Sequence, residues 1–156
     1  MYIQYMDTPI GVLCIQANDK GITSVQFDVE INSETRNNHT AMAASQLLEY
    51  FDLRRTNFTL SLDIYAATKF TQSVWCSLQK IPYGKSISYK NLAYLMGDVN
   101  LIRAAANANA RNPIAIIVPC HRVIGSNGSM TGYANGIWRK AWLLRHEGQN
   151  YQGKLF

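Results

Sequence analysis

The sequence predicts an α+β protein in two parts: a small sheet-and-helix module followed by a mainly helical domain. Between residues 1 and 30, β-branched and aromatic residues alternate with turn-forming residues, as in short antiparallel strands. After residue 65, apolar residues recur at three- and four-residue spacing, as in amphipathic helices. A chain of 156 residues is long enough to bury a core without disulfides or metals. We therefore expect one domain at residues 1–65 and a second at residues 66–156.

Three strands are expected near the N-terminus, in the segments YIQYM (2–6), GVLCIQA (11–17) and ITSVQFDV (22–29). The connecting segments, DTPIG and NDKG, contain the Pro, Gly, Asn and Asp residues that favour turns. Short turns between consecutive strands predict an antiparallel meander.

One helix and a fourth strand should complete the first domain. The segment AMAASQLLEYFDLRR (41–55) has apolar residues near helical spacing, at Met42, Leu47, Leu48 and Phe51. The next segment, TNFTLSLDI (56–64), alternates apolar and polar residues, which predicts a strand. The first domain is thus expected to end near Tyr65.

The second domain should begin with a helix in TKFTQSVWCSLQKI (68–81). Its apolar residues lie on one face, at Phe70, Val74, Trp75 and Leu78. The segment PYG at residues 82–84 should end this helix, because proline and glycine interrupt helical structure.

Two shorter helices should follow, in SYKNLAYLMG (88–97) and NLIRAAANANA (100–110). Ser88 and Asn100 are candidate N-caps, and Gly97 can adopt the left-handed conformation that ends many helices. Two short helices across a tight glycine turn predict a helix-turn-helix.

The second of these helices should expose small side chains around one long cation, Arg103. Small residues let a backbone approach a partner closely, and a single arginine among them can reach into a groove. An alanine-rich packing helix with a solvated arginine would give the same pattern. The exposed positions are expected to be Arg103, Ala106, Asn107 and Ala110.

The formal charge of +5 is distributed unevenly along the chain. Residues 1–80 hold six Lys or Arg and eight Asp or Glu, whereas residues 81–156 hold nine basic and two acidic residues. This asymmetry suggests a polyanionic partner such as nucleic acid for the second half. A basic face that contacts only solvent would also account for it.

The three cysteines, Cys14, Cys76 and Cys120, are widely spaced and form no CxxC pair. We expect reduced thiols without a disulfide or a zinc site, and we interpret Cys14 and Cys76 as small buried hydrophobic residues. No apolar stretch approaches the length of a membrane span, and the N-terminus lacks the pattern of a signal peptide. The sequence therefore predicts a cytoplasmic protein that does not bind membranes.

Cys120 lies in the segment IIVPCHRVIG (116–125), directly before His121. Only the thiolate is a good nucleophile, so a reactive cysteine needs a base or a nearby positive charge. Adjacent side chains do not face each other, so His121 would act on Cys120 through a bridging water. Phosphatase and papain-type arrangements of cysteine fit the sequence less well.

A histidine base also needs an acceptor that fixes its tautomer. The second half of the chain offers only Asp98 and Glu147, and Glu147 ends an amphipathic helix in WLLRHEG. Asn112, before a proline, can tie loops together through its side-chain amide, although a simple Asn-Pro turn is an alternative.

The sequence resembles the O6-alkylguanine-DNA alkyltransferases, also called methylated-DNA–protein-cysteine methyltransferases. The resemblance is carried by IVPCHRVIG, by SNGSMTGYANGIWRKAWLLRHEG, by IPYGKSISYKNLAYLMG and by RNP, and it extends more weakly to TPIGVLCIQANDKGI. It covers essentially the whole chain. It implies an N-terminal ribonuclease-H-like domain and a C-terminal winged helix-turn-helix-like domain that acts on a base rotated out of the DNA duplex.

The resemblance also implies the catalytic roles. Cys120 matches the alkyl acceptor, His121 the base that works through water, and Glu147 the carboxylate partner of the histidine. Asn112 matches the residue that orders the loops of the active site.

Further residues match the DNA-binding set and the base pocket of the family. Arg103 matches the arginine that replaces the extruded base, on a helix in the minor groove. Tyr89 matches the tyrosine that crowds the neighbouring phosphate and can donate to the departing guanine. Ala106, where many relatives have glycine, and Ser126 belong to the same DNA-binding set. The pocket residues are expected to be Tyr133, Gly132 and Val123.

The implied activity is direct-reversal DNA repair by a single-turnover alkyltransferase. An alkyl group would move irreversibly from guanine O6 to Cys120, with thymine O4 as a further candidate site. No metal or organic cofactor is expected. The partner would be double-stranded DNA that carries O6-alkylguanine, bound by a monomer. The alternative is a non-catalytic lesion-binding or regulatory DNA module.

Overall fold

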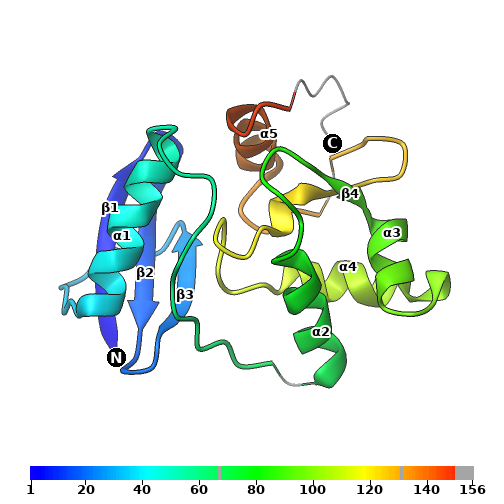
Figure 1. The fold of residues 1–156 in the computed structure, drawn as a ribbon. Helices are drawn as coiled ribbons and strands as arrows, with labels where there is room; N and C mark the ends of the chain where they lie inside the picture. Colours follow the sequence, from blue (N-terminus) through cyan, green and yellow to red (C-terminus); the bar gives the residue numbers. More distant parts are fainter. Residues whose placement is uncertain (67, 131, 150–156) are drawn as a thin grey trace. The chain divides into compact units, whose positions relative to one another are not determined.

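The computed structural model describes residues 1–66, 68–130 and 132–149 (Figure 1). The chain forms two compact units. The first comprises Met1–Tyr65 with Pro113–Ala115, and the second comprises Ala66–Asn112 with Ile116–Phe156. Residues 150–156 of the expected second domain lie outside the described residues.

The first unit contains the expected antiparallel meander. Strands β1 (Tyr2–Thr8), β2 (Gly11–Ala17) and β3 (Ile22–Phe27) are hydrogen-bonded in the order β1-β2-β3. The side chains of β2 are the most buried of the three, because β2 is the central strand. Helix α1 (Asn38–Phe51) packs on this sheet, as Figure 1 shows.

Helix α1 differs from the prediction in its start and in its buried face. It begins at residue 38 because Asn37 and Thr40 form a capping box, in which each side chain accepts from the other's backbone amide. Met42 and Leu48, two of the four apolar residues near helical spacing, are about half exposed. The face that packs on the sheet is Ala43, Leu47, Tyr50 and Phe51.

The predicted strand at residues 56–64 is wrong. Only Leu62 pairs with the sheet, in an isolated parallel bridge to Ile22. Further along the same edge, the amide of Val25 donates to the carbonyl of Pro113 over 2.9 Å, and the amide of Ala115 donates to the carbonyl of Val25 over 3.0 Å. Two short segments that are distant in sequence therefore complete the edge of β3.

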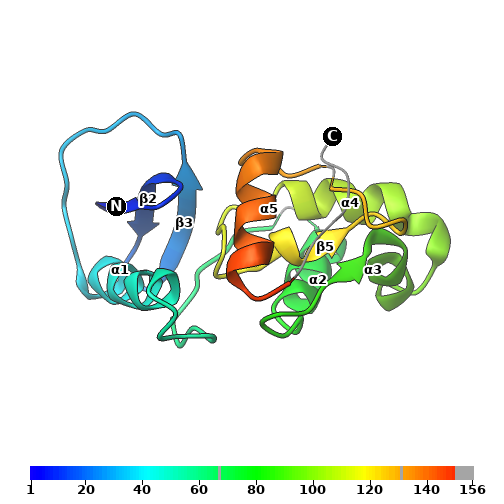
Figure 2. The same cartoon turned by 90° about the horizontal axis from the view of Figure 1, so that it is seen from above.

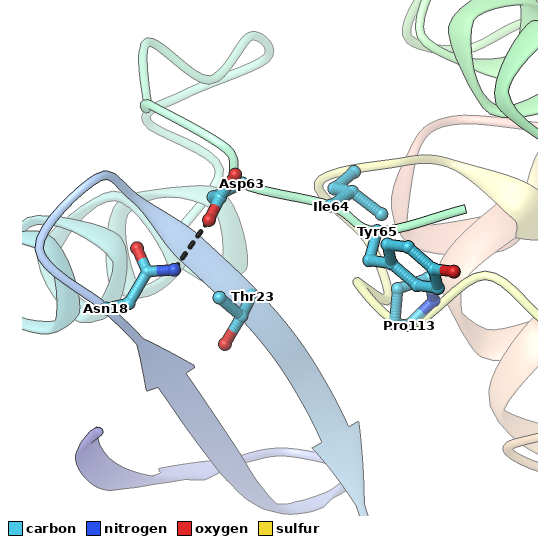
Figure 3. Close-up of a pocket in the computed structure, with 6 residues that line it drawn as sticks. All are labelled: Asn18, Thr23, Asp63, Ile64, Tyr65 and Pro113. Carbon is cyan, nitrogen blue, oxygen red and sulfur yellow. Dashed lines mark hydrogen bonds between the residues drawn. The ribbon is translucent and has the colours of Figure 1, made fainter. Parts of the chain in front are cut away.

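A hollow lies beside β3 in the first unit (Figure 3). Across it, the side-chain amide of Asn18 donates to the carboxylate of Asp63. None of the residues that we expected in the active site lines this hollow. Its lining residues are Asn18, Thr23, Asp63, Ile64, Tyr65 and Pro113.

The second unit is mainly helical (Figure 2), with one short parallel pairing between β4 and β5. Helix α4 packs against α2 and α3. Cys76 lies on α2 and is exposed, so our interpretation of a buried hydrophobic residue is wrong there, whereas Cys14 is buried. The elements are α2 (Lys69–Leu78), β4 (Ile87–Ser88), α3 (Tyr89–Leu95), η1 (Val99–Leu101), α4 (Ile102–Ala110), η2 (Cys120–Arg122), β5 (Val123–Ile124) and α5 (Ile137–His146).

Helices α3 and α4 form the expected helix-turn-helix. Ser88 caps α3 by accepting from the amide of Asn91 over 2.9 Å, and Gly97 follows the helix with a φ of 107°. Asn100 is not a cap. Instead, Asp98 accepts from the amide of Asn100 over 2.8 Å and starts the 3₁₀ turn η1, so α4 begins only at Ile102.

Along the described residues, no helix is both long enough and apolar enough to cross a membrane.

Candidate active site

Cys120 begins the 3₁₀ turn η2 and is 6% exposed. The residues directly before it, 116–119, are all buried. Within this segment Ile116 has a φ of 71°, a left-handed conformation that is strained for a β-branched residue. Backbone strain of this kind is often found at functional sites.

His121 and Glu147 form a buried pair. Nε2 of His121 lies 2.8 Å from Oε2 of Glu147, and both side chains are fully buried. The other ring nitrogen, Nδ1 of His121, is also buried and contacts no hydrogen-bond partner among the described residues. If Nε2 carries the proton that Glu147 accepts, Nδ1 has a free lone pair and can act as a base.

Arg122 binds the same carboxylate through both of its oxygens. Its Nε lies 2.8 Å from Oε1 of Glu147 and its Nη2 lies 3.0 Å from Oε2, which is a bidentate contact. Its third group, Nη1, donates to the carbonyl of Ile81 over 2.7 Å. Glu147 is therefore shared by two neighbouring side chains of η2.

These contacts determine the charges of the cluster. Burial would raise the pKa of Glu147, but His121 and Arg122 outweigh burial and hold this pKa well below its usual range. Burial lowers the pKa of His121, and although Glu147 opposes this effect, the positive charges of Arg122 and Lys140 add to it. The cluster at neutral pH is thus a carboxylate, a guanidinium and an uncharged imidazole.

The thiol of Cys120 is protonated at rest, because burial raises its pKa. A hydrogen bond from Asn112 and the positive charge of Lys140 oppose this rise. A protonated thiol needs a base at the moment of reaction.

Two asparagines connect the end of α4 to the cysteine loop. Nδ2 of Asn112 donates to the carbonyl of Val118 over 2.8 Å. Nδ2 of Asn109 donates to the carbonyl of Cys120 over 3.4 Å. The position of the cysteine backbone therefore depends on the helix that should contact DNA.

Tyr89 and Lys140 lie together beside the thiol. Nζ of Lys140 donates to the hydroxyl of Tyr89 over 3.4 Å, and Lys140 is fully buried. Burial, opposed by the nearby thiol group, lowers the pKa of Lys140 to about 8. Burial raises the pKa of Tyr89 to about 12, so the hydroxyl remains a donor at neutral pH.

The three expected pocket residues are all in the second unit. Val123 is buried in β5, and Tyr133 is buried in the loop before α5. Gly132 has a φ of 72°, and a Cβ atom there would lie 3.3 Å from the hydroxyl of Tyr89. A larger residue at position 132 would thus press on Tyr89.

The expected DNA-binding residues differ in exposure: Arg103 and Ser126 are exposed, whereas Ala106 and Tyr89 are half-buried. Arg103 is exposed on α4 among small neighbours, with Ala106 half-buried on the same helix. Ser126 is exposed in the turn after β5 and is not part of this helix face.

Three residues near the thiol were not predicted from the sequence: Arg122, Lys140 and Asn109. Lys140 carries a signal, because it lies seven residues before Glu147 and shares the buried face of α5 with Leu143 and Leu144. The only sequence signal for Arg122 is its position within an apolar segment. Asn109 gave no recognisable signal.

The second unit combines a helix-turn-helix with a buried cysteine next to a histidine–carboxylate pair. This combination defines a class of DNA-binding proteins with a nucleophilic thiol. Two family domains match the chain: the 6-O-methylguanine DNA methyltransferase ribonuclease-like domain over residues 1–64 and the DNA binding domain over residues 69–149. The chain belongs to the 6-O-methylguanine DNA methyltransferase family.

Individual relatives match over nearly the full length. The methylated-DNA–protein-cysteine methyltransferase of Methanosarcina barkeri is 41% identical over 96% of this chain and 99% of its own. The constitutive methylated-DNA–protein-cysteine methyltransferase of Bacillus subtilis is 39% identical over 98% of this chain and 99% of its own. A crystal structure of the Mycobacterium tuberculosis protein OGT in complex with DNA is similar with a TM-score of 0.86 and 39% identity, covering 94% of this chain and 92% of that one.

Proposed function

We propose that this protein repairs alkylated DNA by moving an alkyl group from guanine O6 to the sulfur of Cys120. The main observation behind the proposal is the buried thiol of Cys120 next to His121, whose Nε2 is hydrogen-bonded to Glu147. The similarity to methylated-DNA–protein-cysteine methyltransferases supports the reaction. Double-stranded DNA is the partner, and the lesion is O6-alkylguanine, with O4-alkylthymine as a second substrate.

In the transfer step the carbon–oxygen bond at O6 breaks and a carbon–sulfur bond forms on Cys120. The thiol proton passes through a bridging water to Nδ1 of His121, the nitrogen that Glu147 leaves available. Glu147 then stabilises the imidazolium that results. The base is needed because the buried thiol is protonated at rest.

The departing guanine takes up a proton, which the hydroxyl of Tyr89 would donate. Its hydroxyl has a pKa of about 12, raised mainly by burial, so it is a protonated donor at neutral pH. Lys140, 3.4 Å from this hydroxyl, would stabilise the phenolate that is left. Gly132 keeps space beside the same hydroxyl for the base, with Tyr133 and Val123 as further walls of the pocket.

The helix-turn-helix presents the DNA to this site. Arg103 stands among small residues on α4, so the helix can approach the duplex closely while the arginine fills the place of the extruded nucleotide. Ala106 would contribute to the contact of α4 with the duplex, and Ser126 would contact the DNA from the turn after β5. One protein molecule binds each lesion. Asn109 and Asn112 join α4 to the cysteine loop, so the thiol is fixed relative to the bound strand.

Because a thioether is not hydrolysed, each molecule acts once and the alkyl group stays on the protein. This stoichiometry distinguishes transfer from a module that only binds lesions. Methylated duplex DNA should add one methyl group to Cys120, as measured by mass spectrometry of tryptic peptides.

The Cys120→Ser variant should acquire no methyl group yet still bind DNA, because the serine hydroxyl has too high a pKa for His121 to activate. Cys76→Ser is the matched control, since Cys76 is an exposed thiol on α2, and it should transfer normally. Full methylation of the Cys120→Ser variant, or none of the wild type, would refute the proposal.

A further inference from the structure

Glu147 occupies a position that is unfavourable for a negative charge. It is the C-cap of α5, where the helix dipole opposes a carboxylate, and its side chain is fully buried. A buried carboxylate requires a counter-charge and hydrogen bonds to both oxygens. Its side chain contacts Arg122 and His121, which can meet this requirement.

Arg122 meets this requirement without using His121. It contacts both oxygens of Glu147, at 2.8 and 3.0 Å, and its side chain is 7% exposed. Its Nη1 is anchored on the carbonyl of Ile81, just beyond α2, over 2.7 Å. The guanidinium also lies 5.8 Å from the ring centroid of Tyr83, whose hydroxyl donates to the carbonyl of His146. Arg122 thus joins η2, the segment after α2 and the end of α5.

We propose that Arg122 is a positioning residue that supplies the counter-charge of Glu147 and so leaves His121 as an uncharged base. Without this guanidinium, the buried carboxylate would favour the imidazolium of His121, because His121 contacts Glu147 directly over 2.8 Å. A histidine that is already protonated cannot accept the proton of Cys120. The arginine therefore decides whether the histidine is available for the chemistry, although it touches neither the thiol nor the substrate.

The other titratable groups around the pair do not replace Arg122. Lys140 on α5 influences His121 through its charge, and its side chain donates to the hydroxyl of Tyr89. Its positive charge would itself disfavour an imidazolium. Among the described residues, Tyr83 interacts electrostatically with Glu147 and Arg122, and Tyr133 interacts with Glu147. The thiol of Cys120 accepts from the backbone amide of His121.

The test is the titration of His121, followed by NMR of the imidazole ring, in the full-length protein. The chain has three histidines, so a His121→Gln spectrum identifies the signal. Arg122→Met should raise the titration midpoint of His121 by about one pH unit or more, as expected for loss of a nearby charge. Arg122→Lys keeps the charge and should leave the midpoint close to that of the wild type.

The matched control is Arg139→Gln, which removes another buried arginine of the same unit that donates to the carbonyl of Asn135 instead. It should leave the midpoint of His121 unchanged. An unchanged midpoint in folded Arg122→Met, or an equal shift in Arg122→Lys and Arg122→Met, would overturn the proposal. If Arg122→Met does not fold, the wild-type-like midpoint of Arg122→Lys remains the required result.

A second readout connects the charge to the reaction and depends on the proposed function. The rate at which Cys120 takes the alkyl group from O6-benzylguanine should have its acidic limb moved to higher pH in Arg122→Met, by the same shift as the NMR midpoint. A wild-type protein that accepts no alkyl group would refute the proposed function, whereas the NMR titration would still test the role of Arg122.

Discussion

Replacing Lys140 with methionine removes a buried cation without emptying the space that its side chain fills. Lys140 is buried, and its contacts include the hydroxyl and the ring of Tyr89. Burial makes the charged form of a lysine less favourable than it is in water, and the folded state bears this cost. The substitution should therefore increase stability while it harms the chemistry of Cys120.

The magnitude follows from the pKa of Lys140, which burial lowers from 10.5 to about 8. Each unit of pKa corresponds to about 1.4 kcal/mol, so the buried charge costs about 3 kcal/mol at neutral pH. Methionine forfeits the hydrogen bond to Tyr89, worth about 1 kcal/mol. We expect Lys140→Met to raise the free energy of unfolding at pH 7 by about 2 kcal/mol.

The difference in the free energy of unfolding between Lys140→Met and the wild type should decrease as the pH rises. Below about pH 8 the lysine is charged in both states, so the full penalty acts on the wild type. Between pH 8 and 10.5 the unfolded chain binds the proton and the native one releases it, so wild-type stability rises with pH relative to the variant. The difference between the two proteins should shrink across this range.

The same substitution should slow alkyl transfer, because the charge of Lys140 lowers the pKa of the Cys120 thiol. Urea unfolding at pH 7 and pH 9.5 measures stability, and the reaction with O6-benzylguanine measures the rate. Lys90→Met, an exposed lysine on α3, is the control and should change neither property appreciably. A Lys140→Met protein that is less stable than the wild type at pH 7 would refute the reasoning.

Three further predictions concern Glu147, Arg103 and the basic half of the chain. Glu147→Gln should slow alkyl transfer. Because the pKa of Glu147 lies below its usual range, the stability of the wild type should fall on acidification below about pH 4.3. Urea titrations of the Glu147→Gln variant should lack this contribution of Glu147 to the pH dependence. Arg103→Ala should lose repair of duplex DNA but still react with O6-benzylguanine at nearly the normal rate, since a free base needs no extrusion; equal losses in the two kinetic assays would argue against Arg103 as the residue that fills the stack. Binding to unmodified duplex DNA should weaken steeply with salt in a fluorescence anisotropy titration, and a flat response would leave the positive charge of residues 81–156 as a solvated face.

The parts of the fold that the sequence predicts are those with local causes. The three strands are short, alternate in polarity and are separated by turn residues, so β1, β2 and β3 were expected at nearly their observed positions. The edge of β3 was not predictable in this way. This edge pairs with Leu62 and with Ile114. Four helical elements of the chain, α2, α3, η1 and α4, separate Leu62 from Ile114.

Helix faces were predicted less well than helix positions. Both Met42 and Leu47 fit a helical period, but only Leu47 packs on the sheet. Ala43 and Tyr50 complete the buried face, and alanine and tyrosine carry too little hydrophobic signal to outweigh methionine in a periodicity argument. The buried face depends on which side the sheet offers, which the helix sequence does not contain.

The site was partly visible because carboxylates are scarce in the second half of the chain. Two candidates could orient His121, and the structure places Glu147 against its ring, whereas Asp98 caps η1. Arg122 and Lys140 were missed for a physical reason. Charged residues are expected at the surface, and their burial here depends on partners brought together only by folding.

Burial also explains how a protein that reacts only once would keep its thiol for the intended substrate. The thiolate is the form that oxidants and adventitious alkylating agents attack. Burial raises the pKa of Cys120, and the uncharged His121 does not hold a thiolate as an ion pair at rest. Under the proposed function, the nucleophile would be generated only when a base enters the pocket and the proton can move to His121. Guanine O6 lies at the major-groove edge of a stacked base, so a thiol buried in a pocket can reach it only after the nucleotide has been rotated out of the duplex. The buried thiol and the extruded nucleotide are then two requirements of one selective reaction.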